Sequence, residues 1–181
     1  MKICCYGAAS DNIDKSFLEA GYTLGEKMAL RGHSLVFGGG ATGMMGASAR
    51  GIHNTGGKVI GVAPKFFDKE GILYKKCDQF FWTDTMRQRK QKMQDLSDAF
   101  IVMPGGIGTF EEFFEMITLK SLEQIHHPIA IFNINGYYNK LIDAIEYASE
   151  TKFMYVSPDE MYRAFTDIDE MLSYIEGSKA V

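Results

Sequence analysis

Short runs of apolar residues alternate along the chain with longer segments in which apolar residues recur every three or four positions. The short runs are typical of buried strands, and the longer segments are typical of amphipathic helices. We expect strands at 2–6, 34–37, 58–63, 78–82, 99–103, 128–132 and 162–165. We expect helices at 13–31, from the glycine loop 38–46 to about 53, at 84–96, from about 110 to about 124, at 137–149 and at 168–175, with 64–76 as a loop.

This alternation predicts the α/β class, with a Rossmann-like, doubly wound and mainly parallel sheet flanked by helices. The length of 181 residues and the hydrophobic content of 46% fit a single domain over 1–181. A net charge of −4 gives no sign of a nucleic-acid or membrane surface. Apolar runs stay well below the ~20 residues of a spanning helix, and the first residues reach a glycine loop too early for a signal peptide.

The three cysteines, two of them adjacent, do not form a disulfide framework, so we expect a reducing, cytoplasmic location. Neither the cysteines nor the four histidines show the spacing of metal ligands. We therefore expect no metal and no cofactor.

Glycine-bearing loops follow three of the expected strands, at 7–10, 38–46 and 104–109. In parallel sheets, ligands bind at the carboxyl ends of the strands, so we expect these loops to converge on one crevice. The loop 38–46 contains a literal G-x-G-x-x-G, but no acidic residue ends the following strand, so a dinucleotide site is disfavoured. Tight strand–helix packing and a nucleotide cradle remain equal interpretations of these glycines.

The segment from Pro104 to Glu112 is the most informative, because it places a glycine turn between a buried strand and the start of a helix. Glycines let a backbone approach a phosphate, and a helix N-terminus offers free N–H groups and a positive dipole end. A carboxylate at Glu112 would repel that phosphate, so it is expected to face another part of the ligand. The alternative is a capping box, in which Glu112 reaches back to the N–H of Thr109.

The expected helix 84–96 carries two cations on its apolar face. Arg89 and Lys90 lie three and four positions after Met86, on the side that also holds Met93. A cation on an inward face is unfavourable unless it meets an anion, and the candidates are a ligand phosphate and Glu112. The alternative is that both side chains extend their charged ends to solvent.

These segments together resemble the LOG (Lonely Guy) family of cytokinin riboside 5′-monophosphate phosphoribohydrolases. The run from Pro104 to Glu112 matches the family pattern P-G-G-x-G-T-x-x-E. Cys5–Ser10 is similar to C-V-Y-C-G-S-S, Leu35–Gly46 to V-Y-G-G-G-x-x-G-L-M-G, and Met86–Lys90 to M-H-x-R-K, with Arg87 in place of the histidine.

The resemblance implies a nucleotide-binding domain that cleaves the N-glycosidic bond of a nucleoside 5′-monophosphate, and typically a homodimer with the site near the subunit interface. It implies that Arg89 and Glu112 are catalytic. Substrate-binding positions, by the resemblance and by the converging glycine loops, are Lys90, Gly105, Gly106, Ile107, Gly108, Thr109, Thr118, Glu70, Ser10, Gly39 and Gly40.

The base stays open at this point, between an N6-substituted adenine of the cytokinin type and the plain adenine of AMP. The loop 68–76 differs from the P-R-E-x-T-G loop of the plant proteins, which bears on the base and leaves the glycosidic chemistry in place. The alternative function is that of a non-catalytic carrier of a nucleotide or of the molybdenum cofactor. Molybdenum-cofactor carrier proteins resemble this chain in the sheet and in the glycine turn. A lysine decarboxylase is disfavoured, because no lysine and acid pair suited to pyridoxal phosphate stands out.

Overall fold

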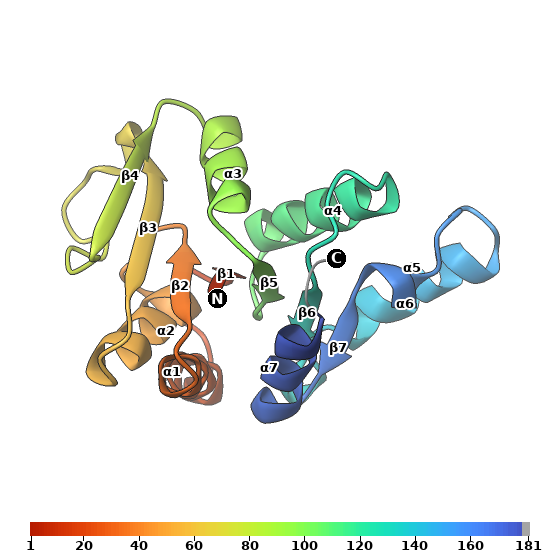
Figure 1. Ribbon diagram of the computed structural model, residues 1–181, viewed down its shortest axis with the longest axis horizontal. Helices are drawn as coiled ribbons and strands as arrows, with labels where there is room; N and C mark the ends of the chain where they lie inside the picture. The colour runs from red at the N-terminus through yellow and green to blue at the C-terminus, as the bar shows by residue number, and fades with distance from the viewer. Residues whose placement is uncertain (179–181) are drawn as a thin grey trace.

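A computed structural model of the chain, which describes residues 1–178, shows one seven-stranded sheet in the order β4-β3-β2-β1-β5-β6-β7 (Figure 1). The strands are β1 (Lys2–Tyr6), β2 (Ser34–Phe37), β3 (Val59–Pro64), β4 (Gln79–Thr83), β5 (Ala99–Val102), β6 (Ile129–Phe132) and β7 (Arg163–Phe165). Every pair of neighbours is parallel. The predicted fold class and the seven predicted strands are confirmed.

Helices cover both faces of this sheet. They are α1 (Lys15–Leu30), α2 (Gly43–Asn54), α3 (Met86–Asp95), α4 (Ile107–Ser121), α5 (Asn139–Glu150), α6 (Pro158–Met161) and α7 (Ile168–Gly177). Buried residues of α1, α2 and α7 form one core with Ile3 and Cys5 of β1. Those of α3, α4, α5 and α6 form the other core with Cys4 and Tyr6, as the two-residue period of a strand requires.

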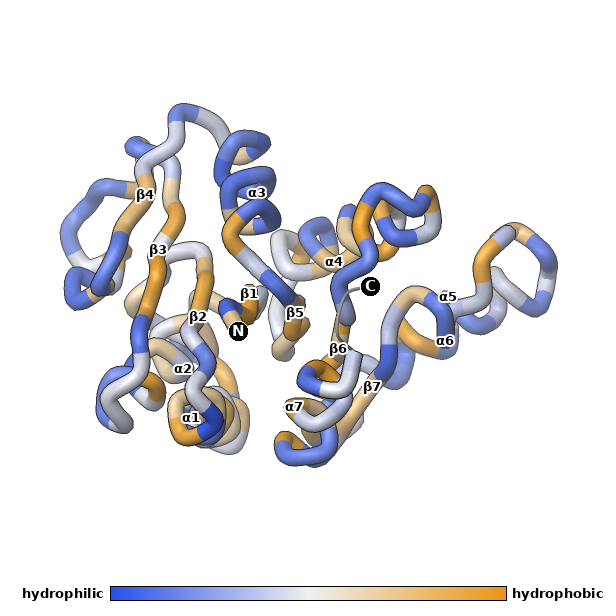
Figure 2. The backbone as a smooth tube through the Cα atoms, viewed as in Figure 1, coloured by the Kyte–Doolittle hydropathy of each residue, from blue (hydrophilic) through white to orange (hydrophobic). Residues whose placement is uncertain are grey.

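The strand order reverses beside β1, the centre of the sheet. The chain builds outward from β1 to β4 and then crosses back, so that β5 pairs with the free side of β1. Crevices at such reversal points are the usual ligand sites of open α/β sheets. Figure 2 shows hydrophobic residues concentrated in the strands, whereas α3, which borders this crevice, is hydrophilic over most of its length.

Small differences from the predicted elements lie at helix ends and in short turns. The four-residue helix α6 was not predicted, although Pro158 at its first position and the Ser157–Glu160 capping box are start signals. The predicted loop 64–76 contains the 3₁₀ turn Lys65–Phe67, and a second such turn spans Ile134–Gly136. Within residues 1–178, the helices fall short of the length and apolarity that crossing a bilayer requires.

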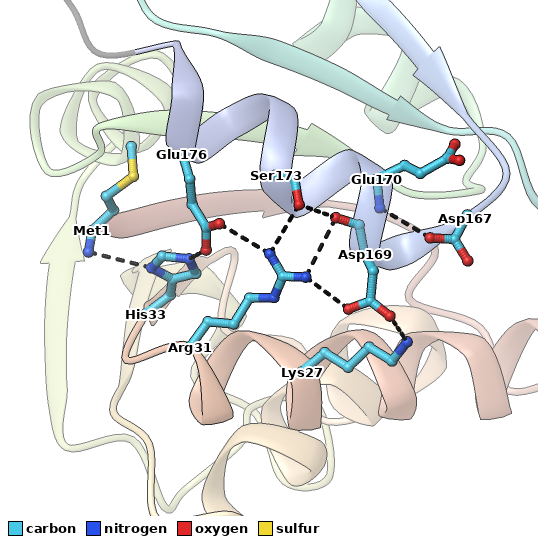
Figure 3. Close-up of polar contacts among 9 residues, drawn as sticks. All are labelled: Met1, Lys27, Arg31, His33, Asp167, Asp169, Glu170, Ser173 and Glu176. Atoms are coloured by element: carbon cyan, nitrogen blue, oxygen red, sulfur yellow. Dashed lines mark hydrogen bonds and ion pairs between the residues drawn. The ribbon is translucent and has the colours of Figure 1, made fainter.

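Helix α7 is fastened to the end of α1 by a polar network (Figure 3). Arg31 pairs with Glu176 at 2.9 Å and with Asp169 at 2.8 Å, and His33 Nε2 lies 2.8 Å from Glu176. Because His33 precedes β2 and contacts the amino group of Met1 ahead of β1, the network lies at the amino ends of the strands. It therefore supports the fold at the edge opposite the glycine loops.

Candidate active site

A cavity of about 570 Å³ opens at the carboxyl ends of β1, β2 and β5. Its volume falls within the range of roughly 300–1,000 Å³ that is common for small-molecule sites. All three glycine-bearing loops contribute to its wall, so their predicted convergence is confirmed. The glycines and alanines of these loops that line it are Gly7, Ala8, Ala9, Gly38, Gly40, Gly106 and Gly108.

Arg89 enters the cavity from α3 and is only 7% exposed. Its Nη1 lies 3.4 Å from Oε1 of Glu112, and its Nε donates a hydrogen bond of 3.3 Å to the carbonyl of Val62 on β3. The absence of a side chain at Gly38 makes room for this guanidinium, because a Cβ there would lie 1.8 Å from Nη2. Arg89 is thus an inward cation with an anionic partner, and the solvent-extended alternative is wrong for it.

Glu112 comes from the second turn of α4 and is also 7% exposed. Helix α4 begins at Ile107 after the N-cap Gly106, which makes no side-chain capping bond. Thr109 therefore lies inside the helix, and the capping-box interpretation of Glu112 is wrong. Burial raises the pKa of Glu112 to about 7, with Arg89 opposing the rise and the nearby Glu111 adding to it.

The glycine turn before α4 is fixed by hydrogen bonds to other segments, and two of its glycines have open space beside them. The N–H of Ala8 donates to the carbonyl of Pro104 at 3.0 Å, and the hydroxyl of Tyr137 donates to the carbonyl of Gly105 at 2.7 Å. A Cβ on Gly106 or Gly108 would meet no described atom within 4 Å, and neither glycine has a positive φ. The fold therefore does not require glycine at these two positions, whereas a ligand that approaches the backbone would.

Two glycines of the loop 38–46 are required by close backbone packing. Gly43 has a φ of 63°, and a Cβ there would lie 2.3 Å from the carbonyl oxygen of Ala8. A Cβ on Gly46 would lie closer still, 2.0 Å from the carbonyl oxygen of Ala41. Tight packing explains these two glycines, whereas Gly38 and Gly40 line the cavity.

Of the predicted site residues, the structure brings Arg89, Glu112, Gly40, Gly106, Gly108 and Thr109 together in the cavity wall. The wall does not include Lys90, Gly105, Ile107, Thr118, Glu70, Ser10 or Gly39. Ser10 and Glu70 are exposed, and the hydroxyl of Ser10 accepts a bond from the N–H of Asn12. Thr118 is exposed in a separate apolar groove between α4 and α5.

Lys90 does not line the cavity, and its side chain reaches two carboxylates of α4, of which Glu111 is a lining residue. Its Nζ forms an ion pair with Glu115 at 2.7 Å and a second, shorter one with Glu111. Partial burial favours the neutral amine, but the bonds to Glu111 and Glu115 outweigh it and raise the pKa of Lys90. Lys90 is therefore not extended into solvent, and its partners are protein carboxylates.

An apolar part of the wall was not predicted. Phe67, Ile72 and Leu73 come from the segment between β3 and β4, which is tied to the glycine loop by a bond from the N–H of Ala41 to the carbonyl of Ile72. Met45 of α2 and Met86 of α3 complete it. The available signal was the presence of large apolar residues in a loop without a regular period. Among residues 1–178, no cluster of three or more His, Cys, Asp and Glu side chains is placed to hold a metal.

Comparison with known proteins gives this geometry a family. Residues 45–175 match the family model described as "Possible lysine decarboxylase". The chain is 34% identical over 175 residues to the cytokinin riboside 5′-monophosphate phosphoribohydrolase LOG4 of Arabidopsis thaliana. This match covers 97% of this chain and 81% of that protein. The chain belongs to the LOG family.

Two other LOG relatives are matched over a smaller share of their own length. The chain is 37% identical over 157 residues to the "Probable cytokinin riboside 5′-monophosphate phosphoribohydrolase LOGL5" of Oryza sativa subsp. japonica, and it spans 63% of that protein. It is 36% identical over 153 residues to LOG7 of A. thaliana, across 84% of this chain and 70% of that one.

Solved structures share the fold at lower identity. The molybdenum cofactor carrier protein of Chlamydomonas reinhardtii superposes with a TM-score of 0.73 at 18% identity, over 98% of this chain and 96% of that chain. The molybdenum cofactor binding protein of Rippkaea orientalis gives 0.72 at 20% identity, over 97% and 95%. These likenesses establish the Rossmann-like sheet and nothing about the ligand.

Proposed function

We propose that this LOG-family protein is a hydrolase that cleaves the N-glycosidic bond of a nucleoside 5′-monophosphate, releasing the free base and ribose 5-phosphate. Its substrates are a cytokinin riboside 5′-monophosphate, as named for the plant relatives, or AMP. The observation that carries the proposal is the buried Arg89–Glu112 pair, which shares one cavity with a glycine turn that the fold itself does not need.

The turn at the start of α4 is the proposed seat of the 5′-phosphate. Gly106 and Gly108 leave the backbone approachable from the cavity, and the 15-residue helix α4 begins at this point with N–H groups that have no partner within the helix. Thr109, which also lines the cavity, adds a hydroxyl in the same turn. An anchored phosphate lets binding energy far from the reacting carbon position C1′.

Glu112 is the proposed catalytic carboxylate. Cleavage of a glycosidic bond passes through an oxocarbenium-like sugar, with positive charge growing at C1′. A carboxylate with a pKa of about 7 is half ionised at neutral pH, so it can stabilise that charge or accept a proton from the attacking water. Arg89 then holds both Glu112 and the substrate in place, and the reaction requires no metal.

The apolar wall is the proposed contact surface of the base. Phe67, Ile72, Leu73 and Met45 present side chains without charge, which suits a planar purine with or without an alkyl group on N6. Because these four side chains carry no charge that would reject either base, both remain candidate substrates. A panel of monophosphates distinguishes them by product analysis.

The decisive experiment incubates the purified protein with AMP and with an N6-isopentenyl analogue and measures the free base by chromatography. Glu112→Gln and Arg89→Ala are expected to lose about 10²–10⁴-fold in rate. Glu146→Gln, on the exposed face of α5, is the matched control and is expected to keep the wild-type rate. Stoichiometric retention of intact nucleotide by the wild type, without base release, would instead indicate a carrier.

The assembly is part of the same proposal. We expect the homodimer that the family resemblance implies, with the site near the subunit contact. The apolar groove of about 470 Å³ between α4 and α5, where Thr118 lies, is the candidate contact surface. Sedimentation equilibrium measures the mass, and a monomer at micromolar concentration would contradict this part.

A further inference from the structure

Three carboxylates crowd one side of α4, and two cations of α3 face them. Glu111 and Glu115 are one turn apart, so they lie on the same helix face, with Glu112 beside them. Arg89 forms an ion pair with Glu112, and Lys90 forms ion pairs with both Glu111 and Glu115. Each helix therefore contributes neighbouring residues, and the charges form two groups: the Arg89–Glu112 pair, and a second cluster in which Glu111 also lines the cavity.

We propose that Lys90 is a positioning residue, which neutralises the two carboxylates flanking Glu112 and so keeps Glu112 ionisable at neutral pH. This inference rests on the proposed function and departs from the substrate-binding role that the family resemblance assigns to Lys90. A phosphate ligand would need an amine that faces the cavity. Lys90 is not among the residues that line the cavity, and its amine is held between Glu115 and Glu111, the second of which lines the cavity through its own side of α4.

The partial burial of Lys90 and Glu115 strengthens their electrostatic effect on Glu112. The side chain of Lys90 is 15% exposed and that of Glu115 is 37% exposed, whereas Glu111 reaches solvent with 54%. Partial burial weakens screening by water and salt, so an uncompensated carboxylate at Glu115 would act strongly on Glu112. Replacement of Lys90 by a neutral residue would leave two such carboxylates beside a third that is already buried.

The other titratable and charged groups around Glu112 do not supply this compensation. From β1, Cys4 and Tyr6 approach Glu112, and Tyr138 approaches it from the start of α5. Burial raises the pKa of each of these three groups above its usual value, so they stay neutral at pH 7. Arg89 opposes the rise in the pKa of Glu112, and Lys90 opposes it as well.

The same contact also fixes the catalytic geometry. Lys90 ties α3 to α4 one residue after Arg89, so the backbone that carries the guanidinium is held at the distance at which Nη1 lies 3.4 Å from Glu112. The capping box of Thr85 and Gln88 starts α3 one turn earlier and fixes its entry. Lys90 thus acts through Glu112 and Arg89 and does not touch the substrate.

The test is the pH dependence of kcat for base release from AMP in Lys90→Met and Lys90→Arg. In Lys90→Met, the acidic limb is expected to shift upward by about one pH unit, because a nearby opposite charge is removed. Lys90→Arg keeps the charge and is expected to retain the wild-type limb. Lys92→Met is the matched control, since it removes the same charge from α3 where Lys92 lies over the ring of Phe81.

A rescue variant separates this role from substrate binding. In Lys90→Met/Glu111→Gln/Glu115→Gln, the flanking charges are gone together with the lysine, so the limb is expected to return to the wild-type pH or below it. A substrate-binding lysine predicts the opposite pattern, namely a raised KM for AMP, an unmoved limb and no rescue. That pattern would overturn the proposal.

A second measurement keeps the inference distinguishable from the proposed function. The pKa of Glu112 is read directly by NMR titration of ¹³C-labelled glutamate side chains, assigned with Glu112→Gln. An upward shift in Lys90→Met, without one in Lys92→Met, supports the role of Lys90 even if no base is released. An unchanged titration of Glu112 in an active Lys90→Met protein refutes it and leaves the proposed function standing.

Discussion

Glu112→Gln should make the protein more stable while it abolishes activity. Burial raises the pKa of Glu112 from 4.5 to about 7, so the folded chain holds the neutral acid more tightly than the unfolded chain does. The stability that the neutral acid contributes is fully present below pH 4.5 and is lost as the pH rises to about 7. Glutamine keeps the size of the side chain and removes the charge, so the variant does not suffer this loss.

The magnitude follows from the two pKa values. At about 1.4 kcal/mol per pH unit, the rise from 4.5 to about 7 amounts to about 3 kcal/mol at pH 8. The gain falls to about 1 kcal/mol at pH 5, where only the unfolded chain is substantially ionised at this residue. At roughly 2–4 °C per kcal/mol for a chain of this length, Tm should rise by roughly 6–12 °C at pH 8.

The assay is thermal unfolding of the wild type and Glu112→Gln by circular dichroism, at pH 5 and at pH 8. Urea unfolding at both pH values gives the free energies of unfolding directly. Glu146→Gln, which changes an exposed carboxylate, is expected to show no such pH-dependent gain. Equal destabilisation of Glu112→Gln at both pH values would refute the reasoning, because it would mean that the carboxylate serves the fold.

Three further outcomes are expected from the contacts of single residues. Gly38→Ala places a Cβ 1.8 Å from Nη2 of Arg89 and so displaces the guanidinium. The kcat should therefore fall by about 10²-fold while the circular dichroism spectrum stays unchanged, and a wild-type kcat would contradict this. Gly106→Ala meets open space, so Tm should hold while KM for the monophosphate rises, and an unchanged KM would remove the turn from the binding site. Cys4 and Cys5 are fully buried, and burial raises the pKa of both thiols. They should therefore react with an aromatic disulfide reagent only after unfolding, which is checked by the absorbance of the released aromatic thiol under native and unfolding conditions.

The sequence predicted the sheet and the positions of Arg89 and Glu112 because both depend on regular periods, whereas a catalytic role for these two residues was implied only by the resemblance to the LOG family. The alternation of strands and helices determines the layers, and helical phase placed Arg89 inward on α3. A strand followed by a glycine turn and a helix places Glu112 near the carboxyl ends of the strands. Neither inference requires knowledge of how distant segments pack, so both were available before the structure.

The apolar wall and the partners of Lys90 depend on packing between segments. Phe67 and Leu73 lie in a segment without a period, and their place in the cavity follows from its attachment to the loop after β2. Helical phase put Lys90 on the same face as Arg89. A step of one residue rotates a side chain by about 100°, and only the crossing of α3 over α4 decides that Lys90 meets Glu111 and Glu115.

The features that weaken the fold gather around one cavity, which is the strongest argument that the cavity is functional. A buried ion pair contributes little net stability, and Glu112 with a pKa of about 7 destabilises the folded chain at neutral pH. Gly108 lies within α4, where glycine costs about 0.5–1 kcal/mol relative to alanine and no packing contact requires it. A carrier would need the open glycine turn alone. A carboxylate kept buried next to a guanidinium is the arrangement that stabilisation of a charge developing on the bound ligand requires, so this pair supports the proposed hydrolysis over storage.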